Sequence, residues 1–563
     1  MYRQSFSSIL LISLAISLFS CRQSPPPPVR FEHAAVVSAH PLATEVGVQI
    51  LKDGGNAIDA MVGVHFALAV VYPAAGNLGG GGFMVSRDNN GEVHTIDFRE
   101  KAPGLADRDM YLDEEGEVIP DLSTLGHLAA GVPGSVMGMW QAHDSLGSLP
   151  WSRLIQPSID LAANGFLLTA KEARGLNGKQ EKFRAVNTEA SAWWQEEPFA
   201  EGDSIVLPDL TKTLTAIRDE GPAGFYQGWV ADSIVAEMER NEGIMTHEDL
   251  SNYHAVWREP IRGSYRDCHI ISMAPPSSGG IALVQLLNMV EPFPMGEYGW
   301  NRTEAVHLMA EAERRVYADR STHLGDQDFW DVPQEELLDE IYLTERMTSF
   351  DPKLATPSDS INAGQFMVME SPQTTHYSIV DESGMAISVT TTLNAGYGSC
   401  VRVDGTGFFL NNEMDDFSSK PGVPNLYGLI GAEANAIEPG KRMLSSMTPT
   451  IVTRGDSLLM VVGTPGGSTI ITSVFQNIVN VVDHGMGMQE SVSAGRIHHQ
   501  WRPDQISYEA GAMTEDIMEA LRQKGHQLHE RGSIGRVDAI LVVPGGWLET
   551  GADPRGDDWS NGY

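Results

Sequence analysis

The sequence predicts a layered α/β fold, in which helices pack against the faces of β-sheets. Three observations support this prediction. Short apolar or alternating segments that are typical of strands occur in both halves of the chain, and longer helical patterns lie between them. The 563 residues are 42% hydrophobic, which is sufficient for a large core. Neither a helix bundle nor a pure sheet sandwich accommodates this mixture of elements.

The first 30 residues are expected to lie outside this fold. After a short leader, residues 9–19 are apolar; this run is too short to span a membrane and is typical of an export signal. The letters L-F-S-C that end at Cys21 resemble a bacterial lipoprotein cleavage site. Residues 1–20 are therefore interpreted as a signal peptide and Cys21 as a lipidated residue, with an ordinary secretory signal as the alternative. Residues 21–30 contain four consecutive prolines and are interpreted as an extended tether. We expect an exported lipoprotein, in the bacterial periplasm or at the outer surface.

The first elements of the fold follow one another closely. Residues 34–38 are a predicted strand and residues 40–51 a predicted helix. A second helix, over residues 57–71, is apolar on nearly all sides and is expected to be buried. The stretch N-L-G-G-G-G at Asn77 is a turn that leads into a strand over residues 83–85. It lacks the Lys-Ser/Thr pair and the helix start that a phosphate-binding loop requires.

The later elements support the same architecture. The middle third is mostly helical, and residues 301–317 carry an apolar stripe with charges opposite, which is typical of core packing. The pattern then changes to strands, and residues 376–380 and 386–393 flank a tight turn and predict a hairpin. A strand over residues 458–462 ends in G-T-P-G-G and is followed by a long apolar helix. Residues 537–543 are the last predicted strand.

The net charge and the cysteine content argue against some classes of binding partner. Acidic residues outnumber basic residues 74 to 38, which gives a formal net charge of -36. Such a charge repels nucleic acid and anionic lipid headgroups, and solubility is the simpler explanation for it. Only Cys268 and Cys400 remain after Cys21, and they form neither a disulfide framework nor a metal-binding pattern. A bridge between them and two isolated thiols both stay open.

The stretch Q-T-T-H-Y-S, which starts at Gln373, carries the main functional signal. A threonine hydroxyl stays protonated at neutral pH and is a poor nucleophile. Cutting the chain before Thr374 would release an α-amine with a reference pKa of about 7.7–8.0, which can accept that proton. The bond between Gln373 and Thr374 is therefore a predicted self-cleavage site. The chain is predicted to be an N-terminal-nucleophile hydrolase with Thr374 as its nucleophile.

Two further features fit a site around Thr374. If the predicted hairpin forms, Thr392 lies beside Thr374 and can hydrogen-bond it, although threonine is also simply a good strand former. Gly466 and Gly467 precede a predicted helix, where unpaired backbone amides can hold an oxyanion. A tight strand-to-helix turn is the alternative reading for the two glycines.

A pocket for an α-amino acid headgroup is also predicted. The acids of N-N-E-M-D-D at Asn411 could bind calcium, although their spacing fits no EF-hand loop, and they can equally hold a substrate ammonium group. Arg99, together with the hydroxyls of Ser445 and Ser446, suits a carboxylate. Each signal is weak alone, and only the combination describes such a pocket. The adjacent His498 and His499 are expected to have core or hydrogen-bonding roles rather than to bind a metal.

Ordered motifs along nearly the whole chain resemble those of the γ-glutamyltranspeptidase family. They are H-P-L-A at His40, G-G-N-A-I-D-A at Gly54, N-L-G-G-G-G-F at Asn77, D-F-R-E at Asp97, P-P-S-S-G-G at Pro275, A-D-R at Ala318, T-T-H-Y-S at Thr374, L-N-N-E-M-D-D-F at Leu410, K-P-G-V-P-N at Lys420, L-S-S-M-T-P-T at Leu444 and G-T-P-G-G-S at Gly463. The resemblance implies an αββα four-layer sandwich of the N-terminal-nucleophile hydrolase type. It also implies that the precursor cuts itself into a large subunit, residues 31–373, and a small subunit, residues 374–563, which form one intertwined fold.

The resemblance also implies a role for each matching site residue. Thr374 would be the nucleophile in processing and in catalysis, with Thr392 as its hydroxyl partner. The other roles would be ammonium binding by Asn394, Glu413 and Asp416, carboxylate binding by Arg99, Ser445 and Ser446, an oxyanion hole at Gly466 and Gly467, and a lid that contains Tyr427.

The implied activity is γ-glutamyl transfer from glutathione or related compounds to water, amino acids or peptides, with no metal or organic cofactor. Two other functions stay open from the sequence. One is a different N-terminal-nucleophile amidase, such as a β-lactam side-chain acylase, whose pocket would need no ammonium site. The other is a non-catalytic, lipid-tethered binding protein that is never cut.

Overall fold

A computed structural model describes residues 28–189, 191–362, 374–420, 423, 425, 426, 428, 429 and 431–563 of the chain. The predicted signal peptide, Cys21, Gln373 and Tyr427 lie outside the described residues. Within these ranges, every helix is either too short or too polar to serve as a membrane span.

Two antiparallel seven-stranded sheets form the centre of the molecule. The order of strands in the first sheet is β1 (Val29–Phe31), β18 (Leu548–Gly551), β17 (Asp538–Val542), β13 (Ser457–Gly463), β12 (Thr450–Arg454), β9 (Cys268–Ser272) and β8 (Ile261–Tyr265). The order in the second is β19 (Trp559–Gly562), β2 (Ala35–Ser38), β10 (Thr375–Val380), β11 (Ala386–Thr392), β3 (Gly81–Arg87), β4 (Val93–Asp97) and β7 (Val256–Arg258).

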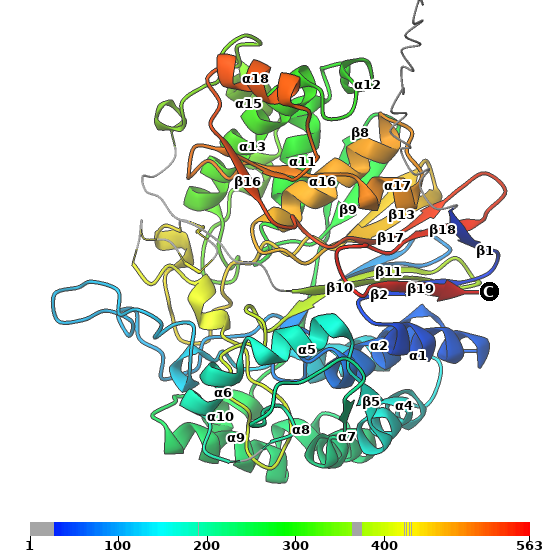
Figure 1. Ribbon diagram of the computed structural model, residues 1–563, viewed down its shortest axis with the longest axis vertical. Helices are drawn as coiled ribbons and strands as arrows, with labels where there is room; N and C mark the ends of the chain where they lie inside the picture. The colour runs from blue at the N-terminus through cyan, green and yellow to red at the C-terminus, as the bar shows by residue number, and fades with distance from the viewer. Residues whose placement is uncertain are drawn as a thin grey trace, which may run out of the picture.

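The two sheets stack face to face (Figure 1). Apolar side chains from both inner faces form one buried cluster that includes Val37, Val85, Ile451 and Ile540. Polar bonds also cross between the sheets: the Ser388 hydroxyl of β11 donates to the Val462 carbonyl of β13 at 3.1 Å. Apolar burial therefore holds the layers together, and such specific bonds fix their register.

Helices cover both outer faces and complete an αββα order (Figure 1). Helices α1 (Pro41–Lys52), α2 (Ala57–Val71) and α3 (Ser135–Leu146) lie against the second sheet, and α11 (Gly279–Val290), α16 (Thr469–Val482) and α17 (Met488–Ser493) lie against the first. Helix α13 (Thr303–His323) packs over α11. The fold class predicted from the sequence is confirmed.

The remaining elements extend the outer layers (Figure 1). Beneath the second sheet are α4 (Trp151–Asn164), α5 (Ala170–Asn177), α6 (Gln180–Val186), α7 (Pro208–Glu220), α8 (Ala223–Tyr226), α9 (Gly228–Arg240) and α10 (His247–Ser251), with the strand pair β5 (Phe166–Leu167) and β6 (Ser204–Ile205). Above the first sheet are α12 (Met295–Tyr298), α14 (Gln334–Leu337), α15 (Glu340–Met347) and α18 (Glu515–Gln523), with a small sheet of β14 (Ile497–His498), β15 (Ile506–Glu509) and β16 (Leu528–Arg531).

Strands from both sides of residue 374 pair with one another in both sheets. In the second sheet, β10 lies between β2 and β11, and β11 pairs with β3. In the first sheet, β1 pairs with β18, and β12 pairs with β9. The segments before and after residue 374 therefore share both sheets.

The predicted strands and helices are present at the positions that the periodicity predicted. One of them, helix α13, differs from the prediction in what surrounds its charged side. Helix α13 is longer than predicted, and its charged side is not solvated. Glu311 is buried between Arg314 and Arg315, at 2.8 and 2.7 Å, and Glu313 accepts the His499 amide at 2.7 Å. The charges opposite the apolar stripe are thus satisfied by protein, because further elements cover this face.

Candidate active site

The hairpin β10–β11 brings the two predicted hydroxyls together. Thr375 pairs with Thr391, so the next positions outward are Thr374 and Thr392. Their Oγ1 atoms lie 3.4 Å apart, and both side chains are buried. The Thr392 oxygen also accepts the Asn394 amide at 2.7 Å. The Thr392 oxygen keeps a second lone pair as well as its hydrogen, so either hydroxyl can be the donor in the bond between Thr374 and Thr392.

The glycine-rich turn before β3 holds this strand end in place. The Asn77 side-chain amide donates to the Thr392 carbonyl at 2.9 Å and to the Thr391 hydroxyl at 3.1 Å. A Cβ on Gly80 would lie 2.1 Å from the Thr392 carbonyl oxygen, so only glycine allows this approach. Sequence reasoning treated this stretch as a turn and missed its part in positioning Thr392.

The two glycines of the predicted oxyanion hole occupy the turn between β13 and α16. Gly466 and Gly467 have φ values of 141° and 57°, in the region that favours glycine. Helix α16 begins at Thr469, and Gly467 lines the same cavity as Thr374. Amides at a helix start lack partners within the helix and can hold negative charge.

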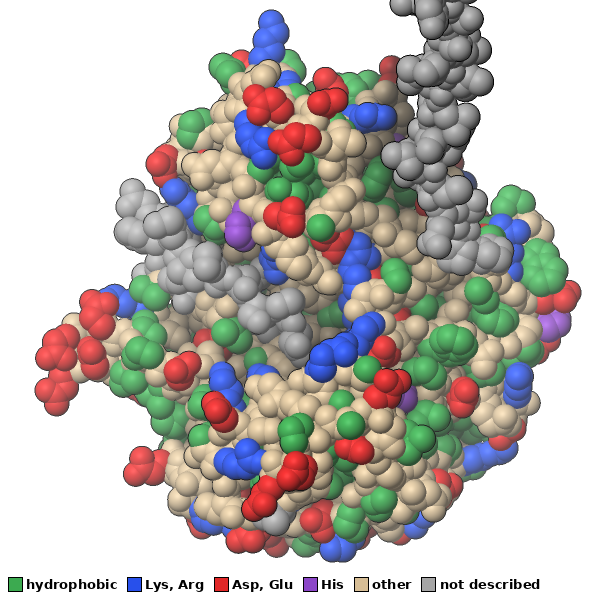
Figure 2. All heavy atoms as spheres, viewed as in Figure 1, with side chains coloured by type: hydrophobic (Ala, Val, Ile, Leu, Met, Phe, Trp, Pro, Cys, Tyr) green, Lys and Arg blue, Asp and Glu red, His purple; other side chains and the backbone are tan. Residues whose placement is uncertain are grey.

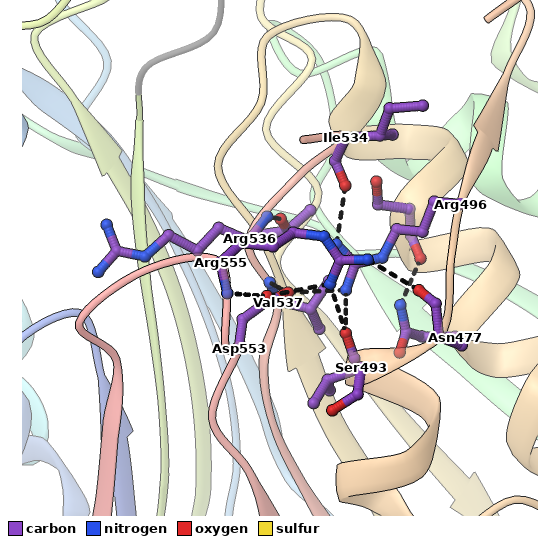
Figure 3. Close-up of polar contacts among 12 residues, drawn as sticks. Asn477, Ser493, Arg496, Ile534, Arg536, Val537, Asp553 and Arg555 are labelled. Carbon is purple, nitrogen blue, oxygen red and sulfur yellow. Dashed lines mark hydrogen bonds and ion pairs between the residues drawn. The ribbon is translucent and has the colours of Figure 1, made fainter. Parts of the chain in front are cut away.

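The segment beside this turn is fixed by a buried arginine network (Figure 3). Arg496 donates to the Ile534 carbonyl at 2.7 Å and pairs with Asp553 at 2.7 Å. Two residues further on, the Arg536 amide donates to the Thr464 hydroxyl at 2.7 Å. The loop that carries Gly466 and Gly467 is therefore held by residues far along the chain.

A cavity with an empty volume of about 300 Å³ contains most of the predicted site. Its lining residues are Arg99, Arg320, Thr374, Thr392, Asn394, Glu413, Asp416, Leu429, Leu444, Ser445, Ser446, Met447, Gly467 and Ile470. Gly466 adjoins this set without lining it. Figure 2 shows the molecule from the same side as Figure 1, with acidic and basic side chains spread over this face.

Arg99 is the centre of the charged end of the cavity. Its guanidinium binds the carboxylates of Glu413 and Asp416, and its Nε donates to the Met443 carbonyl at 3.3 Å. We predicted Arg99 for a carboxylate subsite and the two acids for an ammonium subsite. The structure instead places the two subsites in direct contact. This fits an α-amino acid, whose ammonium and carboxylate are attached to the same carbon.

Burial shapes the charge of this cluster. Desolvation raises the pKa of Glu413 and of Asp416, and the Arg99 guanidinium opposes the rise in both. Burial also raises the pKa of Glu100, which lies 3.7 Å from Arg99, to about 8. Arg99 thus lies close to three buried acids in the described structure. A substrate ammonium would add the positive charge that these carboxylates lack.

Histidine-containing clusters among the described residues are engaged within the protein. His498 bonds Thr472 at 2.9 Å and Gln500 at 2.8 Å, and burial lowers its pKa to about 3. His307 and His526, 2.7 Å apart, lie with Glu311 in an arrangement that could face a metal ion. Because Glu311 already binds two arginines, this cluster is a poor cation site.

Comparisons with known proteins identify relatives of this chain. A sequence model of the family described as gamma-glutamyltranspeptidase matches residues 43–563. A glutathione hydrolase proenzyme from Escherichia coli is 46% identical over 95% of this chain and 93% of its own length. Among solved structures, a cephalosporin acylase from Bacillus halodurans has a TM-score of 0.85 and 25% identity, with 98% of this chain and 99% of that chain covered. A gamma-glutamyltranspeptidase from Helicobacter pylori has a TM-score of 0.57 and 46% identity, with 59% of this chain and 96% of that chain covered.

Proposed function

The chain belongs to the γ-glutamyltranspeptidase family, and from this premise we propose that its glutathione hydrolase and γ-glutamyltransferase activity proceeds through an ester on Thr374. The observation that carries the proposal is that the pair of hydroxyls, Thr374 and Thr392, lines the same cavity as Arg99 with its two acids. A γ-glutamyl group has a reactive carbonyl at one end and an amino acid headgroup at the other. The cavity offers matching chemistry for both groups.

The first step is cleavage of the precursor before Thr374. The E. coli relative is described as a proenzyme, which supports processing in this chain. The Thr374 hydroxyl attacks the Gln373 carbonyl, and an ester replaces the peptide bond, which frees the α-amine of Thr374. Water then cleaves this ester, which leaves a carboxylate on Gln373 and restores the Thr374 hydroxyl. Residues 31–373 and 374–563 then form the large and small subunits.

Catalysis repeats this chemistry on a γ-glutamyl compound such as glutathione. The Thr374 oxygen attacks the γ-carbonyl, and its α-amine takes the hydroxyl proton and gives it to the leaving amine. The amides at Gly466 and Gly467 hold the negative oxygen, an interaction whose loss typically costs about 10²–10³ in rate. Water or an amino acid or peptide then removes the γ-glutamyl group from Thr374.

The headgroup site separates this proposal from the acylase alternative. Glu413, Asp416 and Asn394 would hold the ammonium, and Arg99, Ser445 and Ser446 the carboxylate. A glutaryl side chain has no ammonium and would leave the two buried acids short of positive charge. The solved acylase structure shares the fold, and the charged cluster favours γ-glutamyl over glutaryl substrates.

Replacing Thr374 tests the proposal. Thr374→Ala should remain one uncut chain on a denaturing gel and should lose all hydrolysis of γ-glutamyl-p-nitroanilide. The wild type should yield a fragment that starts at Thr374, detected by mass spectrometry, and should prefer this substrate to glutaryl-p-nitroanilide. Two fragments from the alanine variant would contradict the assignment of Thr374.

The location of the protein is a separate proposal. The apolar run at residues 9–19 and the L-F-S-C stretch support export and a lipid on Cys21. Two outcomes are distinguishable by mass spectrometry of membrane-extracted protein: a lipid-modified Cys21 at the start of the mature chain, or an unmodified chain cut elsewhere.

A further inference from the structure

Arg320 of helix α13 lies in the wall of the cavity that contains Thr374 and the headgroup residues. Its side chain is buried, and it belongs to the A-D-R stretch that starts at Ala318. Burying an arginine at a substrate cavity is costly unless its charge and its hydrogen bonds are used.

The contacts of Arg320 lead to both serines of the predicted carboxylate site. Its Nε donates to the Ser278 hydroxyl at 2.9 Å, and its Nη2 donates to the Ser446 hydroxyl at 3.0 Å. Ser278 in turn donates to the Ser445 carbonyl through its hydroxyl at 2.6 Å and its backbone amide at 2.8 Å. One guanidinium therefore fixes two adjacent serines.

The direction of these bonds determines what Ser446 can do. A guanidinium only donates, so the Ser446 oxygen must be the acceptor. The hydrogen of the Ser446 hydroxyl is then available to donate to another group, and Ser446 lines the cavity. Arg320 thus prepares Ser446 as a hydrogen-bond donor toward a substrate carboxylate.

Charge gives a second reason for Arg320. The guanidinium of Arg99 is already bonded to Glu413 and Asp416, so an entering carboxylate would add a third negative group beside a single cation. Arg320 supplies a second positive charge at the same cavity, close enough to Asp416 to favour its ionised form.

We propose that Arg320 is a positioning residue for the α-carboxylate of the γ-glutamyl donor, acting through the Ser446 hydroxyl and through its own charge. This inference rests on the proposed function, and it concerns recognition of one headgroup charge rather than the chemical step.

The test compares two substrates that differ only in that carboxylate. Arg320→Met should lower kcat/KM for γ-glutamyl-p-nitroanilide about 10- to 100-fold, mainly through KM, as expected for losing a bond to a charged group. The same variant should lose little on 4-aminobutyryl-p-nitroanilide, which keeps the amine and lacks the α-carboxylate. Arg320→Lys, which keeps the charge without the planar fork, should lose less on the first substrate.

Two companion variants sharpen the test. Arg346→Met removes a neighbouring arginine that pairs with Asp319 at 2.8 Å, outside the cavity, and should leave both substrates nearly unaffected. In a cycle with Ser446→Ala, the loss from the double variant should be smaller than the product of the two single losses, because both changes remove one interaction.

The outcomes separate this inference from the function it rests on. Equal losses on both substrates, or wild-type kinetics of Arg320→Met on the γ-glutamyl substrate, would overturn the role of Arg320. A wild type without γ-glutamyl activity would instead overturn the proposed function. If Arg320→Met does not fold or is not cut, Arg320→Lys decides: a loss confined to the carboxylate-bearing substrate supports the role, and an unselective loss refutes it.

Discussion

The Thr392 hydroxyl accepts the Asn394 amide and lies within hydrogen-bond distance of the Thr374 hydroxyl. This arrangement turns an ordinary strand residue into a partner for the nucleophile. The same side chain also carries a methyl group that packs in the sheet, so the hydroxyl and the shape can be tested separately.

Thr392→Val keeps the shape and removes the hydroxyl. We expect kcat for γ-glutamyl-p-nitroanilide to fall about 10- to 100-fold, because one hydrogen bond to the reacting oxygen is lost. Thr392→Ser keeps the hydroxyl and should retain most of the activity. Steady-state kinetics on fully cut protein provides the measurement. Equal activity of the valine and serine variants would show that the hydroxyl is not used.

The buried acid Glu100 predicts a dependence of stability on pH. Its pKa is about 8 in the folded protein, against a usual value of 4.5, and neither of its oxygens has a hydrogen-bond partner. Between these two values the folded state holds a proton that the unfolded chain releases. Stability therefore falls as pH rises through this window.

Glu100→Gln should remove this fall. Denaturant unfolding of the uncut Thr374→Ala protein, with and without Glu100→Gln, should show a smaller loss of stability between pH 5 and pH 8 in the glutamine variant. The difference is on the order of a few kcal/mol at most. Parallel pH profiles for the two proteins would show that Glu100 titrates normally.

At the scale of elements, the turn before β3 and the end of β11 act as one unit. Asn77 and Gly80 come from the turn, and both contact the carbonyl of Thr392. Backbone contacts of this kind leave little room for movement, so the position of the nucleophile pair depends on a loop that carries no reactive group.

Gly80→Ala tests this dependence. The new Cβ would meet the Thr392 carbonyl oxygen at 2.1 Å, so the strand end must shift. We expect slower self-cleavage, lower kcat and a loss of stability of about 1–3 kcal/mol. Gly532→Ala is the matched control, because a Cβ there meets nothing within 4 Å. Normal processing of Gly80→Ala would mean that the turn does not set the geometry of Thr392.

Periodicity predicted the elements that carry the site, and it could not predict their supports. The hairpin, α16 and the buried α2 follow from local patterns of apolar residues. Asn77 meets its partner Thr391 across 314 positions of the chain, and Arg320 meets Ser446 across 126. Such pairings depend on how the layers of the fold pack together, and a local sequence pattern carries no information about that packing. The direct contact of Arg99 with two acids was missed for the same reason.

At the scale of the whole molecule, the two predicted subunits do not separate into two bodies. Strands from both sides of residue 374 pair within each sheet, so parting them would expose backbone donors and acceptors and apolar side chains together.

The cut protein should therefore remain one particle. Native mass spectrometry or size-exclusion chromatography should give the mass of both fragments together, while a denaturing gel should show two bands. Fragments that separate in ordinary buffer would show that the shared sheets do not hold the molecule together.

The interior place of β10 explains why a molecule would make its reactive amine by cutting itself. Protein synthesis leaves one free α-amino group, at the first residue of the polypeptide. A segment that directs export must precede the mature domain at this same end of the chain. Thr374 stands instead at the end of a strand with a neighbour on each side. A cut at this point creates a second beginning of the chain in the middle of a finished sheet, where synthesis alone cannot put one.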